Sequence, residues 1–189
     1  MKRTLYLNFV LAYLIFGFFG FIVVATFTSS MTFEHLKRER ADSLYKEALL
    51  ISDSYAADLY NSEITLESVW RQIEAIGTYL DASIWIVNPS GLVVLDSSLQ
   101  PDFENPITIP NFSPTITGSS FYTVGNFFGM FDEDTISSFA PITSNYKVQG
   151  YVIIHSSLNK IQKSCDSLLN ISYPLWVCGA YNRLPYLWE

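Results

Sequence analysis

Apolar and polar residues alternate in three different ways along this 189-residue chain, and the first pattern is an uncharged run. Residues 4–33 contain no charged side chain, and positions 5–27 are almost continuously apolar. About 20 apolar residues in a helix cross the hydrocarbon core of a bilayer. Because unpaired backbone amides are costly in lipid, the run must be helical. The pattern predicts a transmembrane anchor within residues 1–30, with the lipid bilayer as a partner.

A cleaved signal peptide is the main alternative for this run. Lys2 and Arg3 form a basic start, but the apolar run is longer than a signal core, and residues 25–30 match a cleavage site poorly. The anchor is therefore favoured over a cleaved, secreted binding protein. The two basic residues favour a cytoplasmic N-terminus in the cell membrane, with the following domain extracytoplasmic.

The second pattern begins at Phe33, where apolar residues recur at close to a three-and-four spacing up to Leu59. This spacing places one apolar stripe on a helix. Nothing breaks the chain before it, so we expect the anchor to continue outward as a long stalk helix, interrupted at Asn61-Ser62. The stripe could pack on its own domain or on a second copy of the chain, which leaves a homodimer through the stalk open.

A second, shorter helix is predicted after the stalk. Thr65 is a suitable N-cap, Glu67 supplies an acidic first turn, and the apolar residues keep helical spacing up to Gly77. We expect this helix to stop at Gly77.

The third pattern is typical of strands. Residues 83–87 are rich in β-forming side chains, residues 88–91 fit a type I turn, and residues 92–95 return as the partner strand. Residues 97–120 hold four prolines and predict a long irregular loop. Further extended segments are expected at 121–131, 135–142 and 148–155. The whole predicts an α+β fold, an antiparallel sheet of about five strands flanked by helices.

Charge and cysteine content narrow the function classes. Residues 34–166 hold 17 acidic and eight basic side chains, a net charge of −9, which disfavours nucleic acid as a partner. The two cysteines, Cys165 and Cys178, have no second pair nearby, so they are interpreted as free thiols and a zinc site is not expected.

Several segments resemble a known family. The hairpin Ile84–Gly91 with Asp96-Ser97-Ser98 resembles the central hairpin of extracytoplasmic PAS-like (Cache-type) sensor domains. Residues 128–131, 140–142 and 150–155 resemble sensor histidine kinases of Gram-positive, clostridial-type bacteria. The resemblance covers residues 1–165, and its motifs specify architecture rather than a ligand. It implies two-component signal transduction.

The C-terminal segment departs from that family. Its members continue into a second membrane helix and then a kinase core, whereas here Pro174, Asn182, Arg183 and Pro185 interrupt the apolar run. We expect an anchor at 1–30, a PAS-like sensor domain with its stalk at 31–165, and a disrupted or truncated second membrane segment at 166–189. A frameshift near residue 173 is one hypothesis. No phospho-acceptor histidine box or ATP lid is present, so this chain is not expected to be an enzyme.

Candidate binding residues follow from chemistry and position. Asp96, at the end of a strand, could accept a hydrogen bond from an amine or hydroxyl group, although capping the following turn is the simpler role. Trp85, Tyr122 and Tyr151 could line an aromatic pocket, although aromatic residues on strands more often belong to the core. A structural role is favoured for His155 and a solvated turn for residues 132–134; no catalytic residue, metal ligand or cofactor is expected.

The sequence thus predicts the signal-sensing portion of a membrane-bound sensor histidine kinase, responding to a small molecule or an envelope signal. Two alternatives stay open. One is a freestanding membrane-tethered binding module, and the other is the input domain of a chemoreceptor or a cyclic-dinucleotide enzyme.

Overall fold

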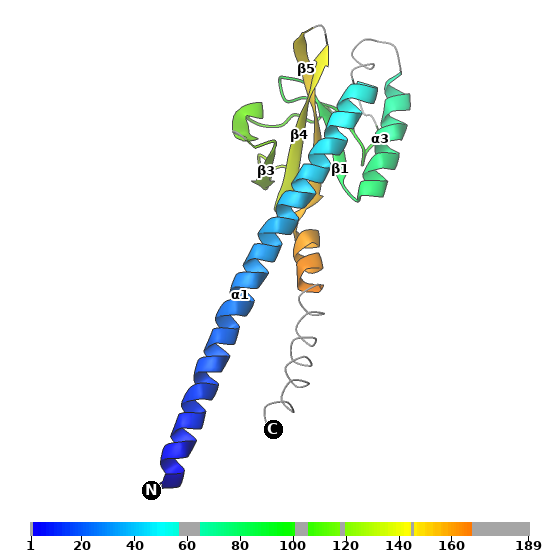
Figure 1. Cartoon of the computed structure of the whole chain (residues 1–189). Helices are drawn as coiled ribbons and strands as arrows, with labels where there is room; N and C mark the ends of the chain where they lie inside the picture. The colour runs from blue at the N-terminus through cyan, green and yellow to red at the C-terminus, as the bar shows by residue number, and fades with distance from the viewer. Residues whose placement is uncertain (1, 57–64, 101–105, 118–119, 145, 168–189) are drawn as a thin grey trace. The chain divides into compact units, whose positions relative to one another are not determined.

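The computed structural model describes residues 2–56, 65–100, 106–117, 120–144 and 146–167 (Figure 1). The chain divides into two compact units. One comprises residues 1–36 and 162–189, and the other comprises residues 37–161. Each unit is described by itself below, and the candidate site lies wholly within the second.

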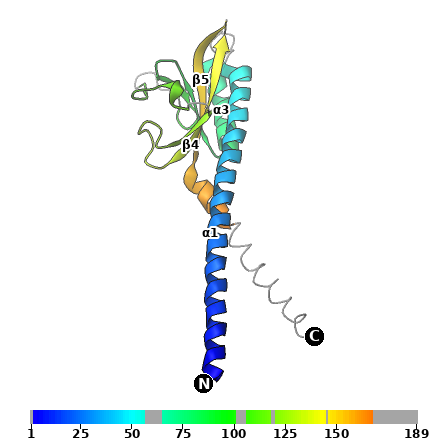
Figure 2. The same ribbon diagram turned by 60° about the vertical axis from the view of Figure 1, so that its left-hand side comes forward.

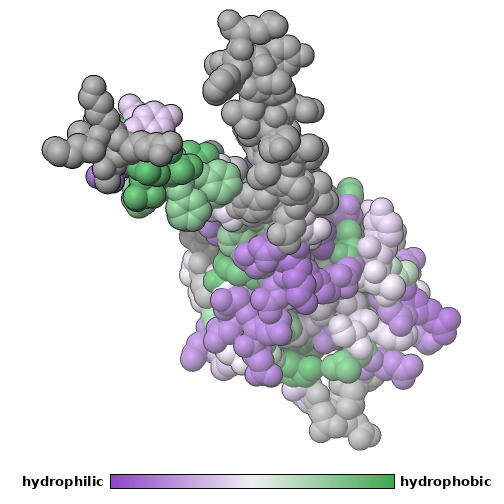
Figure 3. Space-filling model, turned by 90° about the horizontal axis from the view of Figure 1, so that it is seen from below, coloured by the Kyte–Doolittle hydropathy of each residue, from purple (hydrophilic) through white to green (hydrophobic). Residues whose placement is uncertain are grey.

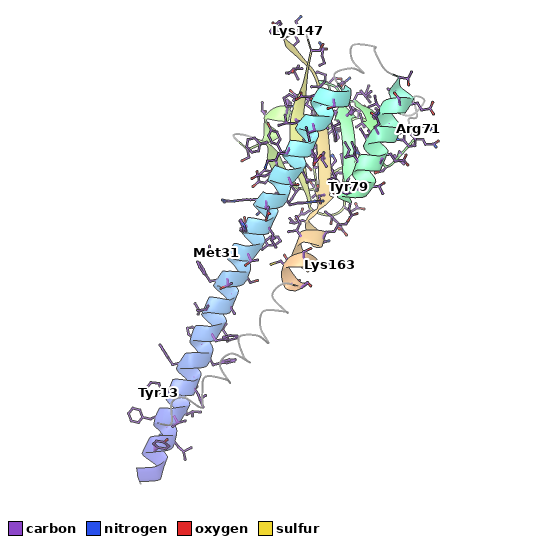
Figure 4. The ribbon with its side chains drawn as sticks, turned by 45° about the vertical axis from the view of Figure 1, so that its right-hand side comes forward. Tyr13, Met31, Arg71, Tyr79, Lys147 and Lys163 are labelled. Atoms are coloured by element: carbon purple, nitrogen blue, oxygen red, sulfur yellow. The ribbon has the colours of Figure 1, made fainter. Side chains whose placement is uncertain are left out.

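The helix α1 extends over Lys2–Ile51, so the predicted anchor and stalk form one uninterrupted helix. Its large apolar side chains from Tyr6 to Phe27 are exposed, and Tyr13, labelled in Figure 4, is 75% exposed. Figure 3 shows this apolar stretch in green. A helix that is apolar on every side and unburied by protein requires an apolar surrounding. By length and composition, α1 can cross a membrane.

The sheet of the second unit has five strands in the order β2-β1-β5-β4-β3, and all neighbouring strands are antiparallel. The order places β1 and β5, distant in sequence, side by side at its centre. The strand bounds are β1 Ser83–Val87, β2 Val93–Asp96, β3 Tyr122–Gly125, β4 Thr135–Ser144 and β5 Lys147–Ser157. The predicted α+β fold, with a five-stranded antiparallel sheet and helices, is confirmed.

The helix α3, Leu66–Leu80, begins where the sequence predicts and ends later. The Thr65 hydroxyl accepts a hydrogen bond from the backbone N–H of Ser68, as an N-cap does. The predicted stop at Gly77 is wrong. Gly77 is buried, and a Cβ there would lie 2.9 Å from the carbonyl oxygen of Ala82. The glycine therefore permits a close approach, and the helix ends at Leu80, followed by the C-cap residue Asp81, whose φ is 52°.

The turn between β1 and β2 forms as the sequence predicts. The Asn88 side-chain oxygen accepts hydrogen bonds from the backbone N–H groups of Ser90 and Leu92, at 3.0 and 2.9 Å. Gly91 has a φ of +89°, and a Cβ there would lie 2.6 Å from the Cβ of Phe112. Only glycine fits this turn, because the chain segment carrying Phe112 crosses directly over it.

The extended segment predicted at 121–131 is only partly confirmed. The strand β3 ends at Gly125, and residues 126–131 form turns in which Phe127 and Phe128 have φ values of 45° and 55°. Aromatic side chains at positive φ are uncommon and are held there by tertiary contacts. The short helices η1, Ser52–Ala56, and η2, Pro114–Thr117, complete the described elements.

The sheet has two faces with different coverings (Figure 2). The "helix face" packs on α3 and on α1 from residue 37 onward. Its buried residues include Ile84, Ile86, Ile136, Ser138, Ile142, Val152 and Ile154, beneath Ala41, Leu44, Ala48, Val69 and Ile73. The "loop face" is covered by the segments 106–112 and 126–131. Its buried cluster comprises Trp85, Val87, Phe139 and Ile153 from the strands with Ile109 and Phe127 from the loops.

The stripe of the stalk therefore finds its partner within its own chain. Ala41, Leu44 and Ala48 are each fully buried. The Ser138 hydroxyl on β4 donates a hydrogen bond to the carbonyl oxygen of Ala41 at 3.1 Å. The C-terminal half of α1 is thus part of the core of the domain. The predicted interruption at Asn61-Ser62 lies outside the described residues.

Candidate functional site

Aromatic rings dominate the loop face of the sheet. Trp85 on β1 stacks with Phe131 at a centroid distance of 5.4 Å and meets Phe127 edge-on at 5.8 Å. Phe112 meets Tyr151 edge-on at 5.9 Å. Rings from the strands thus pack against rings from the loops that cover the sheet. Such ring contacts bury a large apolar area.

His155 on β5 sits inside this aromatic cluster. It is 3% exposed, and its ring centroid lies 4.6 Å from that of Trp85, 4.4 Å from Phe127 and 4.9 Å from Phe131. Its cross-strand partners are Ser83 on β1 and Ser137 on β4. A polar ring at the centre of an apolar cluster costs free energy unless both of its nitrogens are paired.

Only one imidazole nitrogen of His155 is paired. Nδ1 lies 2.8 Å from the Ser137 hydroxyl, whereas Nε2 is buried and makes no hydrogen bond with the described residues. The indole N–H of Trp85 is also buried and makes no hydrogen bond with the described residues. Such atoms are rare in folded proteins, and each calls for a structural or functional explanation.

A chain of hydroxyl groups determines which nitrogen of His155 carries the proton. The Thr135 hydroxyl donates to the carbonyl oxygen of Gly125 at 3.1 Å, and it lies 3.3 Å from the Ser137 hydroxyl. A carbonyl oxygen can only accept, so Thr135 donates there and accepts from Ser137. When Ser137 donates to Thr135, the same hydroxyl accepts from Nδ1, and Nδ1 carries the proton; the 2.8 Å contact by itself fits either tautomer of His155.

Burial also fixes the charge of this side chain. Removal from water disfavours the imidazolium form and lowers the pKa of His155 to about 3. At neutral pH the ring is therefore uncharged.

A pocket of about 790 Å³ lies between α3, the start of β1 and the end of β5, and His155 forms part of its wall. This volume is typical of sites for small molecules. The pocket is lined by Glu74, Gly77, Thr78, Asp81, Ala82, Ser83, Ser97, Ser98, Phe131, Asp132, Glu133, Thr135, His155, Ser157 and Lys160.

The charges around the pocket are unequal. Lys160 donates to the Asp81 carboxylate at 2.6 Å, and this contact lowers the pKa of the exposed Asp81. The Glu133 carboxylate accepts from the Asn159 amide at 2.9 Å. Glu74 and Asp132 also belong to the wall. No group of three or more histidine, cysteine or acidic residues is arranged to hold a metal ion among the described residues.

Three of the four residues predicted from the sequence lie on the loop face. Trp85 belongs to the buried cluster, Tyr151 packs against it, and Asp96 is the cross-strand partner of Trp85. Tyr122 lies opposite Ser138, so its side chain projects from the helix face. The structure thus separates Tyr122 from the other three, and none of the four lines the pocket.

Asp96 caps the turn that follows it, the simpler of its two expected roles. Its carboxylate accepts from the backbone N–H of Ser98 at 2.7 Å. Burial raises the pKa of Asp96, partly offset by this hydrogen bond. Trp85 also favours the charged form of Asp96, although the indole N–H does not reach hydrogen-bond geometry.

Sequence reasoning missed the functional prospects of His155 and of the carboxylates around the pocket. A lone histidine ending a strand carries no signal of an unpaired nitrogen, because the pairing depends on Ser137 and Thr135 across the sheet. Glu74 and Glu133 are 59 positions apart, and no local motif links them.

The fold resembles several solved structures, of which two are described. One is a domain of a sensory box/GGDEF family protein from Vibrio parahaemolyticus, with a TM-score of 0.51 and 14% identity over 68% of this chain. The other is the sensor domain of the histidine kinase DctB from V. cholerae, with a TM-score of 0.50 and 17% identity over 71% of this chain. The matches span 58% and 55% of those chains. No family model matches the chain, and no curated protein does either.

Proposed function

We propose that this chain is the extracytoplasmic sensing portion of a membrane-bound sensor histidine kinase. Support comes from an apolar helix able to cross a membrane, joined without a break to a domain whose fold is similar to that of a kinase sensor domain. The observation that carries the proposal is the pocket of about 790 Å³ between α3, the start of β1 and the end of β5, with His155 among its lining residues.

In this proposal α1 is held by the bilayer with its N-terminus in the cytoplasm, and the sheet domain is outside the cell. A ligand in the pocket would contact α3 and β5 together. Because β5 leads directly into the helical residues 158–167, a change in its position would reach the next segment of the chain. A ligand shifts such an equilibrium only by its different affinities for the two arrangements.

The chain itself is proposed to carry no catalysis, and the output to be supplied by kinase parts of the signalling protein. A homodimer through α1 remains part of the proposal. Since Ala41, Leu44 and Ala48 are buried within the chain, such a dimer would use another side of α1.

The second candidate is the input part of a cyclic-dinucleotide enzyme. It is favoured by one observation, the likeness to a domain of a sensory box/GGDEF family protein at a similar TM-score. Expression of the chain fused to either kind of output domain, followed by assay of phosphorylation or of cyclic-dinucleotide synthesis, distinguishes the two.

The binding step is tested with the full chain in nanodiscs of phosphatidylcholine. A panel of amino acids, carboxylates, amines and nucleobases is screened for a saturable rise in the thermal midpoint. Thr78 lines the pocket, so Thr78→Trp should fill it and abolish the rise. Tyr79→Trp is the matched control, because Tyr79 is the next residue of α3, is 87% exposed and does not line the pocket. Equal responses in both variants would place binding elsewhere and remove the support for this proposal.

Membrane topology is tested in intact cells. Tyr146 lies in the tight β4–β5 turn and is fully exposed, so Tyr146→Cys in a background lacking Cys165 and Cys178 should react with a membrane-impermeant maleimide. Labelling only after cell lysis would contradict the extracytoplasmic location.

A further inference from the structure

Residues 126–131 close the loop face over His155, and we name this segment the aromatic cover. We propose that the aromatic cover opens when His155 takes up a proton, so that acidification of the medium changes the loop face. The inference goes beyond the proposed sensing function, because the opening requires no ligand in the pocket.

The closed cover admits only the uncharged form of His155. The imidazole is 3% exposed, and the rings of Phe127 and Phe131 contact it at centroid distances of 4.4 and 4.9 Å. Trp85 on β1 closes a further side at 4.6 Å. An imidazolium in this place would lose its hydration, and the attraction of aromatic rings for a cation recovers only a small part of that loss. Protonation therefore requires that the cover move away.

Charged groups around His155 do not compensate for the lost hydration. The strand partners of His155 are the uncharged Ser83 and Ser137. The charged groups that share the pocket wall with His155, or that lie on β2, are Glu74, Asp81, Asp96, Asp132, Glu133 and Lys160. Burial alone causes the lowered pKa of His155, with no contribution from any of these groups. None of them holds a proton on the closed imidazole.

The aromatic cover is attached to the sheet through its side chains. The Met130 N–H donates to the carbonyl oxygen of Phe127 at 3.0 Å. The Phe131 N–H donates to that of Asn126 at 3.2 Å. Both hydrogen bonds are internal to the cover, and the ladder between β3 and β4 ends before the cover begins. The cover can therefore move as a unit without breaking them.

The backbone of the cover is strained while it is closed. Phe127 and Phe128 have φ values of 45° and 55°, a left-handed conformation that costs free energy for residues with large side chains. Gly125, directly before the cover, has a φ of +142°, and glycine accepts a change of φ more readily than any other residue. Opening relieves the strain at the two phenylalanines, so the ring contacts beneath the cover are what keeps it closed.

Proton uptake and opening are linked through the pKa of His155 in the two forms. Under the closed cover this pKa is about 3, whereas a hydrated imidazole has a pKa of 6.5. Below pH 6.5 the open form therefore binds a proton that the closed form does not, and opening is favoured as the pH falls. From pH 7 to pH 5 the ratio of open to closed cover should rise about 25-fold. Phe131 also lines the pocket, so opening changes one wall of that site.

Ile153 provides a probe position beneath the cover. It lies between Trp85 and Phe139 on the neighbouring strands, and the ring of Phe127 contacts both of those rings at 5.8 Å. Ile154, the next residue, is equally buried but lies on the helix face. A reagent therefore reaches position 153 when the cover opens, whereas it reaches position 154 when the whole domain unfolds.

The experiment measures thiol labelling of the full chain in phosphatidylcholine nanodiscs, in a background lacking Cys165 and Cys178. Ile153→Cys and its matched control Ile154→Cys react with a disulfide reagent, at concentrations where the rate is proportional to the reagent. Tyr146→Cys, at a fully exposed position, corrects for ionisation of the thiol at each pH. Ile153→Cys should react about tenfold faster than Ile154→Cys, because a local opening costs less than complete unfolding. Its corrected rate should rise about 25-fold from pH 7 to pH 5.

The two histidines test the origin of that rise. In the Ile153→Cys background, His155→Gln should reduce the rise to less than about twofold, because the group that takes up the proton is gone. His35→Gln should leave the rise unchanged, since His35 is exposed on α1. The comparison of the two isoleucine positions requires no change at His155, so it tests the proposal even if His155→Gln fails to fold.

Three results would overturn the proposal. Equal rates for Ile153→Cys and Ile154→Cys at pH 5 would mean that water reaches His155 through complete unfolding alone. A corrected rate for Ile153→Cys that is the same at both pH values would show that acid does not open the cover, and an undiminished rise with a folded His155→Gln would assign the response to another group. Each of these results leaves the sensing function in place, because the ligand panel with Thr78→Trp tests that function separately.

Discussion

The two faces of the central sheet differ in whether their buried polar atoms are hydrogen-bonded. On the helix face, apolar side chains fill the space and polar groups find partners: the hydroxyl groups of Ser138 and Ser52 donate to the carbonyl oxygens of Ala41 and Pro141. On the loop face, the buried polar atoms Nε2 of His155 and Nε1 of Trp85 make no hydrogen bond with any residue that the structure describes. The two faces therefore differ in how their buried polar atoms are paired.

This difference indicates a division of roles within one small domain. Regular helices on the helix face provide stability. The loop face carries the cost of two buried polar atoms that make no hydrogen bond with the described residues. Residues 126–131, with two aromatic residues at positive φ, add a locally strained covering to the same face.

The largest expected effect compares two neighbouring residues of β5 that are both fully buried, Ile154 on the helix face and Ile153 on the loop face. Ile154→Ala should lower the free energy of unfolding by about 4 kcal/mol, and Ile153→Ala by about 2–3 kcal/mol. The loops can close part of the cavity, whereas the helices cannot. Denaturant unfolding of the chain in micelles measures both, and a larger loss for Ile153→Ala would contradict the comparison.

The second effect is a dependence on pH that belongs to the loop face. The pKa of His155 is lowered to about 3 in the folded protein, below the 6.5 expected when unfolded. Between these values the unfolded state binds one more proton, so stability is lost as the pH falls below 6.5. Acidification from pH 7 to pH 5 should cost about 2 kcal/mol through this group.

The two histidines of the chain provide the control. His155→Gln should reduce the stability loss between pH 7 and pH 5 by that amount, whatever its effect at pH 7. His35→Gln should leave the loss unchanged, because His35 is exposed on α1. Equal acid sensitivity of His155→Gln and the unaltered chain, followed by unfolding at each pH, would show that His155 does not titrate in this way.

The smallest expected effect compares two neighbouring serines of β4. Ser138→Ala removes one hydrogen bond to a helix carbonyl on the helix face and should cost about 1 kcal/mol. Ser137→Ala leaves the buried Nδ1–H of His155 without an acceptor and should cost about 1 kcal/mol more. Denaturant unfolding at pH 7 measures the difference, and equal costs would argue against a stabilising hydrogen bond between Ser137 and His155.

Local patterns in the sequence predicted much of the fold. The bounds of β1, the turn at Asn88–Gly91 and the N-cap at Thr65 all depend on residues close together in the chain, and all three are confirmed. The prediction was wrong at Gly77 and incomplete after Gly125. In both places the backbone conformation depends on packing contacts. At Gly77 these are with Ala82 and Ser97, and after Gly125 they are with the rings packed around Phe127.

The candidate site was less predictable than the fold. Trp85, Asp96 and Tyr151 were placed on one face by the alternation of side chains along strands, which sequence alone can supply. Tyr122 was not, because its face depends on the register between β3 and β4. The pocket itself combines residues of α3, β1 and β5 with the loop after Phe131, and no spacing rule connects these segments.

The sequence by itself determined the uncharged helix, the stripe of the stalk, the first hairpin and the acidic balance of the domain, because these depend on composition and on neighbours within about one or two turns. The tertiary structure alone decided that the stripe packs on its own sheet, that Gly77 lies inside a helix, and that His155 keeps an unpaired nitrogen. Those features arise where chain segments far apart in sequence meet, and only their packing sets which polar atoms are left without a partner.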